Sequence, residues 1–235
     1  MTNNLVGYQQ NSFTRGFFWV HASWKIFSAE WKMWLLFALV QLLCNLVIAS
    51  IPGGGTIVNV FLSAGAMYAV DKQLSGDKLQ YKDWIFGVEN RVKPLFMMAL
   101  FYLLGGLICV VVSLPFLALI FLNPNEITHV VLVVSLVSLI FFALILPLIM
   151  AEIFAPYLIV HRQMDAKSAM MASFRGCMKN ILPFLAHNLY FFALIPVVFL
   201  TCGLFIFALG PIFYISIYVS ARDIFPGKTL FEIPN

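Results

Sequence analysis

Long stretches without charged residues constrain this chain more than any other feature of its sequence. Residues 94–122 include no Asp, Glu, Lys or Arg, and residues 128–160 include only Glu152. A helix needs about 20 apolar residues to cross the hydrocarbon core of a bilayer. With 62% hydrophobic and 10% charged residues among 235, a soluble fold would have nowhere to bury this much apolar surface. The sequence therefore predicts an all-α polytopic membrane protein.

Polar interruptions divide the apolar sequence into six candidate transmembrane helices. They cover residues 33–51, 56–70, 94–122, 128–160, 181–200 and 204–221. The fourth is longer than one crossing requires, which predicts a bend near Pro147 or Pro156. We expect the turn before the sixth at residues 201–203, with residues 210–211 as the alternative.

The positive charges follow the alternation that six crossings require. Three Lys or Arg residues precede the first span, five lie in residues 72–93, four in residues 162–179, and two follow residue 221. The short connections at residues 52–55, 123–127 and 201–203 have none. Because Lys and Arg concentrate in cytoplasmic loops, this pattern predicts a multi-pass protein of the bacterial inner membrane with both termini in the cytoplasm.

A threefold pattern indicates an internal repeat. Three phenylalanines are each followed by a base five residues later and by a second phenylalanine ten residues later. The three sets are Phe27, Lys32 and Phe37; Phe86, Arg91 and Phe96; and Phe174, Lys179 and Phe184. Agreement at three positions in three loops favours a duplicated unit of an interfacial helix followed by two spans. We therefore expect a single membrane domain, 1–235, with units at about 13–74, 75–160 and 161–225, forming three helical hairpins.

Each expected hairpin is preceded by a cytoplasmic segment with the apolar spacing of an amphipathic helix. Trp and basic side chains in these segments suit the headgroup layer of a membrane. The residues expected to contact headgroups or a partner protein are Trp24, Trp31, Trp84, Arg162, Lys167, Arg175 and Lys179. The alternative is a structural collar, in which the apolar stripes pack against the helical bundle. Asp165 is the expected N-cap of the third amphipathic helix.

Two sequence segments resemble a known family. The first runs from PYLIV at residues 156–160 through Met164, Ala169, Met170 and SFR at residues 173–175, and the second is SIYVSARDIF at residues 216–225. They resemble YciC-like and other uncharacterised six-span bacterial inner-membrane proteins, which are related to the membrane domain of glycerophosphodiester phosphodiesterases. The resemblance implies a six-helix membrane fold without an established activity. No phosphodiesterase domain is present in this sequence, so that chemistry does not carry over.

Five polar residues fall at similar depths within the expected spans. They are Gln41, Asn45, Glu152, His187 and Asn188. Because ionisable groups are costly inside a bilayer, we expect these residues to form a buried polar cluster in its cytoplasmic half. A Glu152–His187 pair could move a proton or hold a polar substrate group. The alternative is that these groups only join helices through hydrogen bonds.

The sequence contains none of the common catalytic motifs, and its four cysteines form no C-x-x-C pair. We therefore expect no enzyme activity, no cofactor and no metal site, and the composition excludes nucleic-acid binding. The predicted function is a non-enzymatic membrane protein that interacts with lipids or organises a membrane complex. The alternative is a small transporter that uses Glu152 and His187. Small residues such as Gly105 and Gly106 leave a homo-oligomer or a second membrane protein open as the partner.

Overall fold

The computed structural model describes residues 8–226, and every regular element in that range is a helix. The predicted cytoplasmic termini, residues 1–7 and 227–235, lie outside the described residues. In chain order the elements are α1 (Arg15–Ala29), α2 (Trp31–Ile48), α3 (Gly54–Leu74), the 3₁₀ helix η1 (Tyr81–Ile85), α4 (Phe86–Asn90), α5 (Val92–Leu117), the 3₁₀ helix η2 (Ala118–Leu122), α6 (Ile127–Glu152), α7 (Ala155–His161), α8 (Ala166–Lys179), α9 (Ile181–Ala193), α10 (Ile195–Leu200) and α11 (Ile206–Ile224).

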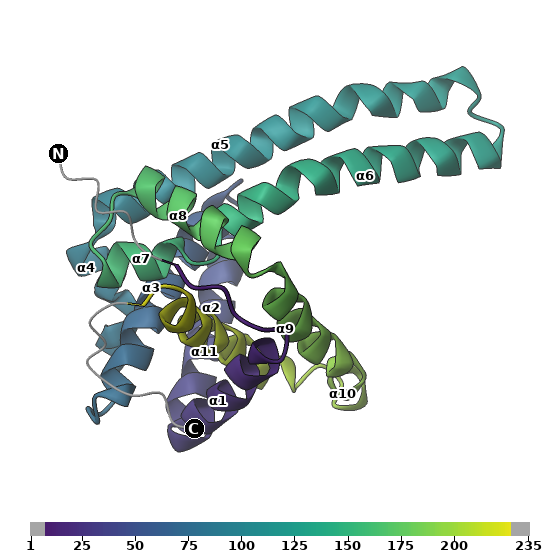
Figure 1. The fold of residues 1–235 in the computed structure, drawn as a ribbon. Coiled ribbons are helices and arrows are strands. Elements are labelled where there is room, and N and C mark those ends of the chain that lie inside the picture. Colours follow the sequence, from purple (N-terminus) through teal and green to yellow (C-terminus); the bar gives the residue numbers. More distant parts are fainter. Residues whose placement is uncertain (1–7, 227–235) are drawn as a thin grey trace.

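Helix α11 lies at the centre of a packed body that we call the base, made of α1, α3, α4, α7, α8, α11 and η1 (Figure 1). From Pro211 onward most residues of α11 are buried, and Tyr218 is completely enclosed. A helix that is buried on all sides packs against several neighbours, and α11 contacts α1, α2 and α3. The core of the described chain therefore surrounds its last helix.

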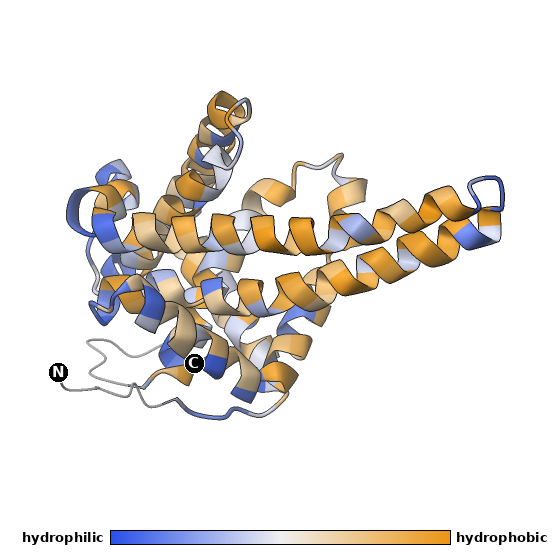
Figure 2. Cartoon of the chain, turned by 90° about the horizontal axis from the view of Figure 1, so that it is seen from above, coloured by the Kyte–Doolittle hydropathy of each residue, from blue (hydrophilic) through white to orange (hydrophobic). Residues whose placement is uncertain are grey.

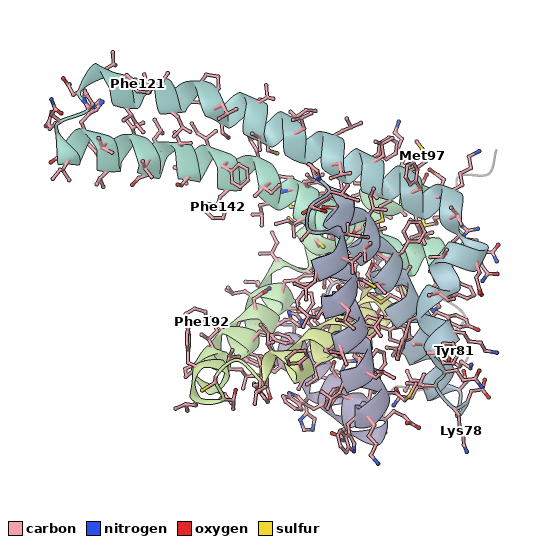
Figure 3. The ribbon with its side chains drawn as sticks, turned by 180° about the vertical axis from the view of Figure 1, so that it is seen from behind. Lys78, Tyr81, Met97, Phe121, Phe142 and Phe192 are labelled. Atoms are coloured by element: carbon pink, nitrogen blue, oxygen red, sulfur yellow. The ribbon has the colours of Figure 1, made fainter. Side chains whose placement is uncertain are left out.

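Two apolar arms extend from the base in different directions (Figure 1). The long arm consists of α5 and α6, which lie antiparallel, and the short arm consists of α9 and α10. Figure 2 shows the long arm as hydrophobic along its length and hydrophilic at its tip. Phe142 on the long arm is 66% exposed and Phe192 on the short arm is 70% exposed, and Figure 3 shows them on separate arms. Most large side chains of the arms therefore face outward.

Four helical stretches are long and apolar enough to cross a membrane. They are Trp31–Ile48, Val92–Leu122, Ile127–His161 and Ile181–Leu200. The expected spans at 56–70 and 204–221 correspond to α3 and α11, which have a larger share of polar residues than these four. The structure thus shows an all-helical chain with apolar helices typical of a membrane protein.

The helix boundaries agree with two of the sequence predictions. Helix α6 ends at Glu152 and α7 begins at Ala155, so the break immediately precedes Pro156, while Pro147 remains inside α6. Pro156 has no N–H to donate to the carbonyl four residues earlier, at Glu152, which explains why α6 ends there. The last turn contains Gly203 with φ of +86°, and Pro211 lies within α11. The turn is therefore at residues 201–205, close to the first of the two expected positions.

Helices α1, α4 and α8 are separated from α2, α5 and α9, which follow them, by breaks of nearly the same backbone geometry. The break residues are Glu30 (φ −132°, ψ 38°), Arg91 (φ −134°, ψ 32°) and Asn180 (φ −120°, ψ 31°). The phenylalanines used for the sequence frame, at positions 27, 86 and 174, lie three, five and six residues before these breaks. The repeat defined by the three breaks therefore does not align with the repeat defined by the three phenylalanines.

The short helices bury only some of their apolar side chains. In α1 the buried face includes Trp19 and Ile26, whereas Phe17 is exposed. The second amphipathic helix is divided into η1 and α4. In α8 the small residues pack inward, while Met171 and Met178 are exposed beside the basic side chains. Asp165 caps α8 as predicted, since its Oδ2 accepts a hydrogen bond of 3.1 Å from the Ser168 N–H.

Candidate functional site

Two of the predicted polar residues meet between α2 and α3. The Gln41 side-chain amide donates to Asn59 Oδ1 at 3.1 Å, and Asn45 exchanges hydrogen bonds with Asn59 at 3.1 and 3.2 Å. Gln41 also donates to the Tyr214 hydroxyl of α11 at 2.7 Å. We call these four side chains the polar layer. Hydrogen bonds between helices satisfy polar groups that would otherwise be costly in an apolar surrounding, and this layer joins α2, α3 and α11.

Glu152 lies beside the polar layer and not within it. Its carboxylate lies near the Tyr102 hydroxyl of α5, and it is also close enough to Tyr214 for the two groups to interact electrostatically. Tyr102 and Glu152 are both only partly buried. The pair therefore connects the two helices of the long arm near the position where they leave the base.

His187 occupies a different environment on the far side of α11. Its Nε2 lies 2.8 Å from Ser216 Oγ, and Trp19 and Phe191 are among the aromatic side chains around its ring. Asn188 is exposed and donates to the carbonyl of Phe184 in its own helix.

The expected single cluster is thus divided among separate places. Gln41 and Asn45 come together, and Glu152 lies nearby, but within residues 8–226 no hydrogen bond or ion pair joins Glu152 to His187. The physical reason is the divergence of the two arms, because α6 follows α5 whereas α9 packs on α1. The similar depths read from the sequence did not define the direction in which each helix leaves the base.

A polar cluster that the sequence analysis did not identify lies where α3, α7 and α11 end. The Tyr218 hydroxyl donates to Asp71 Oδ1 at 2.5 Å, and Arg222 Nη1 lies 3.4 Å from the same hydroxyl. His161 Nε2 is 3.9 Å from Asp71 Oδ2, and the His161 ring stacks on Tyr157. An acid, an imidazole, a phenol and a guanidinium are therefore connected at the centre of the base.

A sequence signal for this cluster exists. Tyr157 is followed by His161 and Tyr218 by Arg222, each pair four positions apart at the ends of two expected spans. Residues four apart share a helix face, so each pair projects toward the same neighbour. The sequence alone does not place the two helix ends together, which is why the cluster escaped prediction. Chemically, the cluster can hold a proton or an ionic group, and it also joins three helices.

Asp223 stabilises the start of α1 against the end of α11. Arg15 donates to both of its carboxylate oxygens at 2.7 and 2.9 Å, and the indole N–H of Trp19 donates at 2.8 Å. The hydrogen bond to Asp223 raises the pKa of Arg15 further above its ordinary value. Bidentate pairing of this kind fixes the orientation of both groups. Arg222 and Asp223 thus point to different partners, as expected for adjacent helical residues.

The four basic side chains that were expected to contact headgroups have different surroundings in the structure. Arg162 donates to the Phe225 carbonyl at 2.8 Å, and Lys179 lies 4.5 Å from the centre of the Tyr8 ring. Lys167 and Arg175 are exposed on α8. Three of the four cations therefore lie on or at the end of the surface that also exposes Met171 and Met178.

The predicted tryptophans differ in exposure. Trp31 is 49% exposed, and Trp24 is partly buried and stacks on Phe205. Trp84 is only 3% exposed because it packs against Phe37 in the core. The expectation that Trp84 contacts headgroups is therefore wrong, and its aromatic surface stabilises the base.

Among residues 8–226, no three His, Cys, Asp or Glu side chains are gathered closely enough to hold a metal ion. Comparison of the chain with known protein families, with curated proteins and with solved structures found no match. The interpretation of function therefore depends on the geometry described above.

Proposed function

We propose that this chain is a non-enzymatic integral membrane protein of the bacterial inner membrane that interacts with lipids and organises a membrane complex. In this proposal α2, α3, α5, α6–α7, α9–α10 and α11 provide six crossings arranged as three hairpins. The short helices α1, η1, α4 and α8 lie at the cytoplasmic face, together with both termini and the ends of α3, α7 and α11 that pack near them.

The observation that carries this proposal is the divergence of two apolar arms from one base (Figures 1 and 2). The base also exposes cations such as Lys167 and Arg175. The outer parts of α5 and α6 pack mainly on each other. Their exposed side chains, such as Leu107, Ile108 and Leu139, require an apolar surrounding, which lipid or a partner membrane protein can provide. At 1.5 Å per residue, the 26 residues of α5 extend about 39 Å, enough to cross a hydrocarbon core of about 30 Å.

The number of crossings has support from the course of the chain. Helix α3 has 21 residues and packs against α2, so it can return across the membrane beside it. The polar residues that reduce its mean hydropathy include Asn59, whose side chain is hydrogen-bonded to α2. A returning helix that is shielded by its neighbours does not require a fully apolar surface.

A transporter that uses Glu152 and His187 is the alternative. It has less support, because the two side chains have different partners on different arms. Reconstituted protein with Glu152→Gln distinguishes the two functions, since a transporter would lose substrate or proton flux and a lipid-organising protein would not.

Native mass spectrometry of the purified protein tests the proposal. We expect membrane phospholipids, a second membrane protein or further copies of the chain to remain bound after mild detergent extraction. A spectrum that contains only the bare monomer, under conditions that preserve lipid on a reference membrane protein, would contradict the proposal.

A further inference from the structure

A pocket of about 390 Å³ lies between the start of α5 and the start of α8. Its volume is within the range of small-molecule sites, about 300–1,000 Å³. Three cations line it, namely Arg91, Lys93 and Lys167. The rest of its wall includes the apolar side chains of Met97 and Phe101. The pocket therefore combines a cationic rim with an apolar wall.

The cations are held or presented in different ways. Arg91 donates from Nε to the Ile159 carbonyl at 3.1 Å and from Nη2 to the Met164 carbonyl at 3.2 Å. These bonds fix the guanidinium at the pocket before any ligand arrives. Lys93 and Lys167 are exposed, so their ammonium groups can move toward an anion.

One acid also lines the pocket. The Asp165 carboxylate accepts from the Ser168 N–H as the cap of α8. Against three positive charges, this carboxylate leaves the lining with a net charge of +2. The electrostatic preference of the pocket is therefore for an anion.

The backbone of the pocket is constrained at Gln163, which lines it with a φ of +53°. Non-glycine residues adopt this left-handed conformation only where the surrounding structure enforces it, and such residues concentrate at functional sites. The loop between α7 and α8 is therefore held in one backbone conformation beside the pocket.

The apolar wall leads out of the pocket along α5. Phe101 follows Leu100, and both belong to the exposed surface of α5 that continues outward through Leu104. Figure 3 shows Met97 at the end of the long arm that joins the base, opposite Phe121 at the tip. The cations thus lie where the apolar surface of the arm begins, which corresponds to the boundary between headgroups and acyl chains in a bilayer.

We propose that this pocket binds the phosphate of an anionic phospholipid, with Arg91, Lys93 and Lys167 around the headgroup and the acyl chains along Met97 and Phe101. This inference rests on the proposed function and assigns it a ligand class and a site. Basic pockets between membrane helices on the cytoplasmic side are suited to such headgroups. A soluble phosphate compound shares the charge but not the acyl chains, so the apolar wall favours the lipid.

The test compares two double variants of the full-length protein. Lys93→Gln/Lys167→Gln removes the two mobile cations, and Lys78→Gln/Lys82→Gln removes two exposed cations outside the pocket. Each variant loses two charges, so the general attraction to anionic lipid changes equally. Arg91 stays intact because its hydrogen bonds also hold the α7–α8 loop.

Each protein is delipidated in detergent and then mixed with one of three ligands. These are palmitoyl-oleoyl phosphatidylglycerol, phosphatidylethanolamine with the same acyl chains, and glycerol 3-phosphate. Native mass spectrometry measures the bound ligand. We expect the pocket variant to bind phosphatidylglycerol about 25-fold more weakly than the wild type, at about fivefold for each lysine near a membrane surface. The control variant should differ from the wild type by less than about threefold, and phosphatidylethanolamine should bind less well than phosphatidylglycerol.

Equal binding of phosphatidylglycerol by the pocket variant and the control variant would overturn the pocket assignment while leaving lipid interaction intact. A wild type that binds neither lipid would contradict the proposed function as well. Glycerol 3-phosphate could instead displace phosphatidylglycerol at equal concentration and bind more weakly to the pocket variant. That result would support a phosphate site but overturn the lipid as its ligand in favour of a soluble phosphate compound.

Discussion

At the scale of single residues, the Lys72–Asp83 pair connects α3 to η1. Lys72 Nζ lies 2.9 and 3.1 Å from the two carboxylate oxygens of Asp83, which also accepts from the Gln80 N–H at 2.7 Å. Asp83 is 4% exposed. Removing one member of a buried pair leaves an uncompensated charge, and this loss exceeds the net contribution of the intact pair.

We therefore expect Lys72→Met to reduce the free energy of unfolding by about 3 kcal/mol. Lys72→Met/Asp83→Asn should recover much of that loss, because the asparagine is neutral and still accepts from the Gln80 N–H. The measurement is unfolding of detergent-solubilised protein by dodecyl sulfate, with the exposed Lys78→Met as the control. If the double variant lost as much stability as Lys72→Met and Asp83→Asn lose together when measured singly, the two side chains would not be coupled.

The same pair should make stability depend on pH at the alkaline end. Its hydrogen bond to Asp83 raises the pKa of Lys72 above the ordinary value of 10.5. A raised pKa in the folded state means that the stabilisation is complete below the unfolded pKa and is lost as the pH rises through the folded pKa. Between pH 9 and 12 the wild type should therefore lose more stability than Lys72→Met.

At the scale of elements, close approach between helices depends on particular small residues. A side chain at Gly65 of α3 would overlap the backbone carbonyl of Trp84 in η1, whereas the space at Gly106 of α5 is open within 4 Å. Both residues have small neighbours in the sequence, Ala64 and Ala66 for Gly65 and Gly105 for Gly106. Only the structure distinguishes the position that a neighbouring backbone occupies from the position that faces outward.

We expect Gly65→Ala to lower the free energy of unfolding by about 1–3 kcal/mol, because α3 and η1 must move apart. Gly106→Ala should be neutral or slightly stabilising, since alanine is the better helix former by about 0.5–1 kcal/mol. Thermal unfolding in detergent, followed by tryptophan fluorescence, measures both. Equal melting temperatures for the two variants would show that α3 and η1 can separate without loss of stability.

The residues also show what could be predicted at the level of elements. The Asp165 cap and the break before Pro156 depend on local rules, and both were predictable from a few neighbouring residues. The meeting of Asp71 with Tyr218 joins residues that are 147 positions apart, and it depends on how α3 and α11 pack. Trp84 was misassigned for the same reason, because a tryptophan in an amphipathic stretch suits a headgroup layer and a core equally well.

At the scale of the whole molecule, the number of crossings determines the side of the membrane on which each loop lies. With six crossings and both termini in the cytoplasm, Lys78 lies inside, whereas Asn125 and Cys202 lie outside. If only the four most apolar stretches crossed, with the same N-terminal orientation, all three positions would be reversed. Cys202 is exposed in the turn before α11, so it can serve as a native probe.

Labelling of intact cells with a membrane-impermeant maleimide tests this arrangement. In variants with one cysteine each, we expect reaction at Cys202 and at Asn125→Cys, and reaction at Lys78→Cys only after the membrane is permeabilised. The Cys202 variant has the other three native cysteines replaced by serine, and the Asn125→Cys and Lys78→Cys variants have all four replaced. Labelling of Lys78→Cys alone in intact cells would refute the six-span arrangement.

The short outer connections affect how such a chain could be made. The tip between α5 and α6 carries Glu126 as its charged residue, and the turns at residues 49–53 and 201–205 carry none. Translocating a charged or polar loop through a bilayer is the costly step of membrane insertion. In the six-span arrangement each pair of helices can enter from the cytoplasm as it leaves the ribosome while moving at most one charge across. Biogenesis of this protein should therefore require an insertase and little transport of polar chain by the secretion motor.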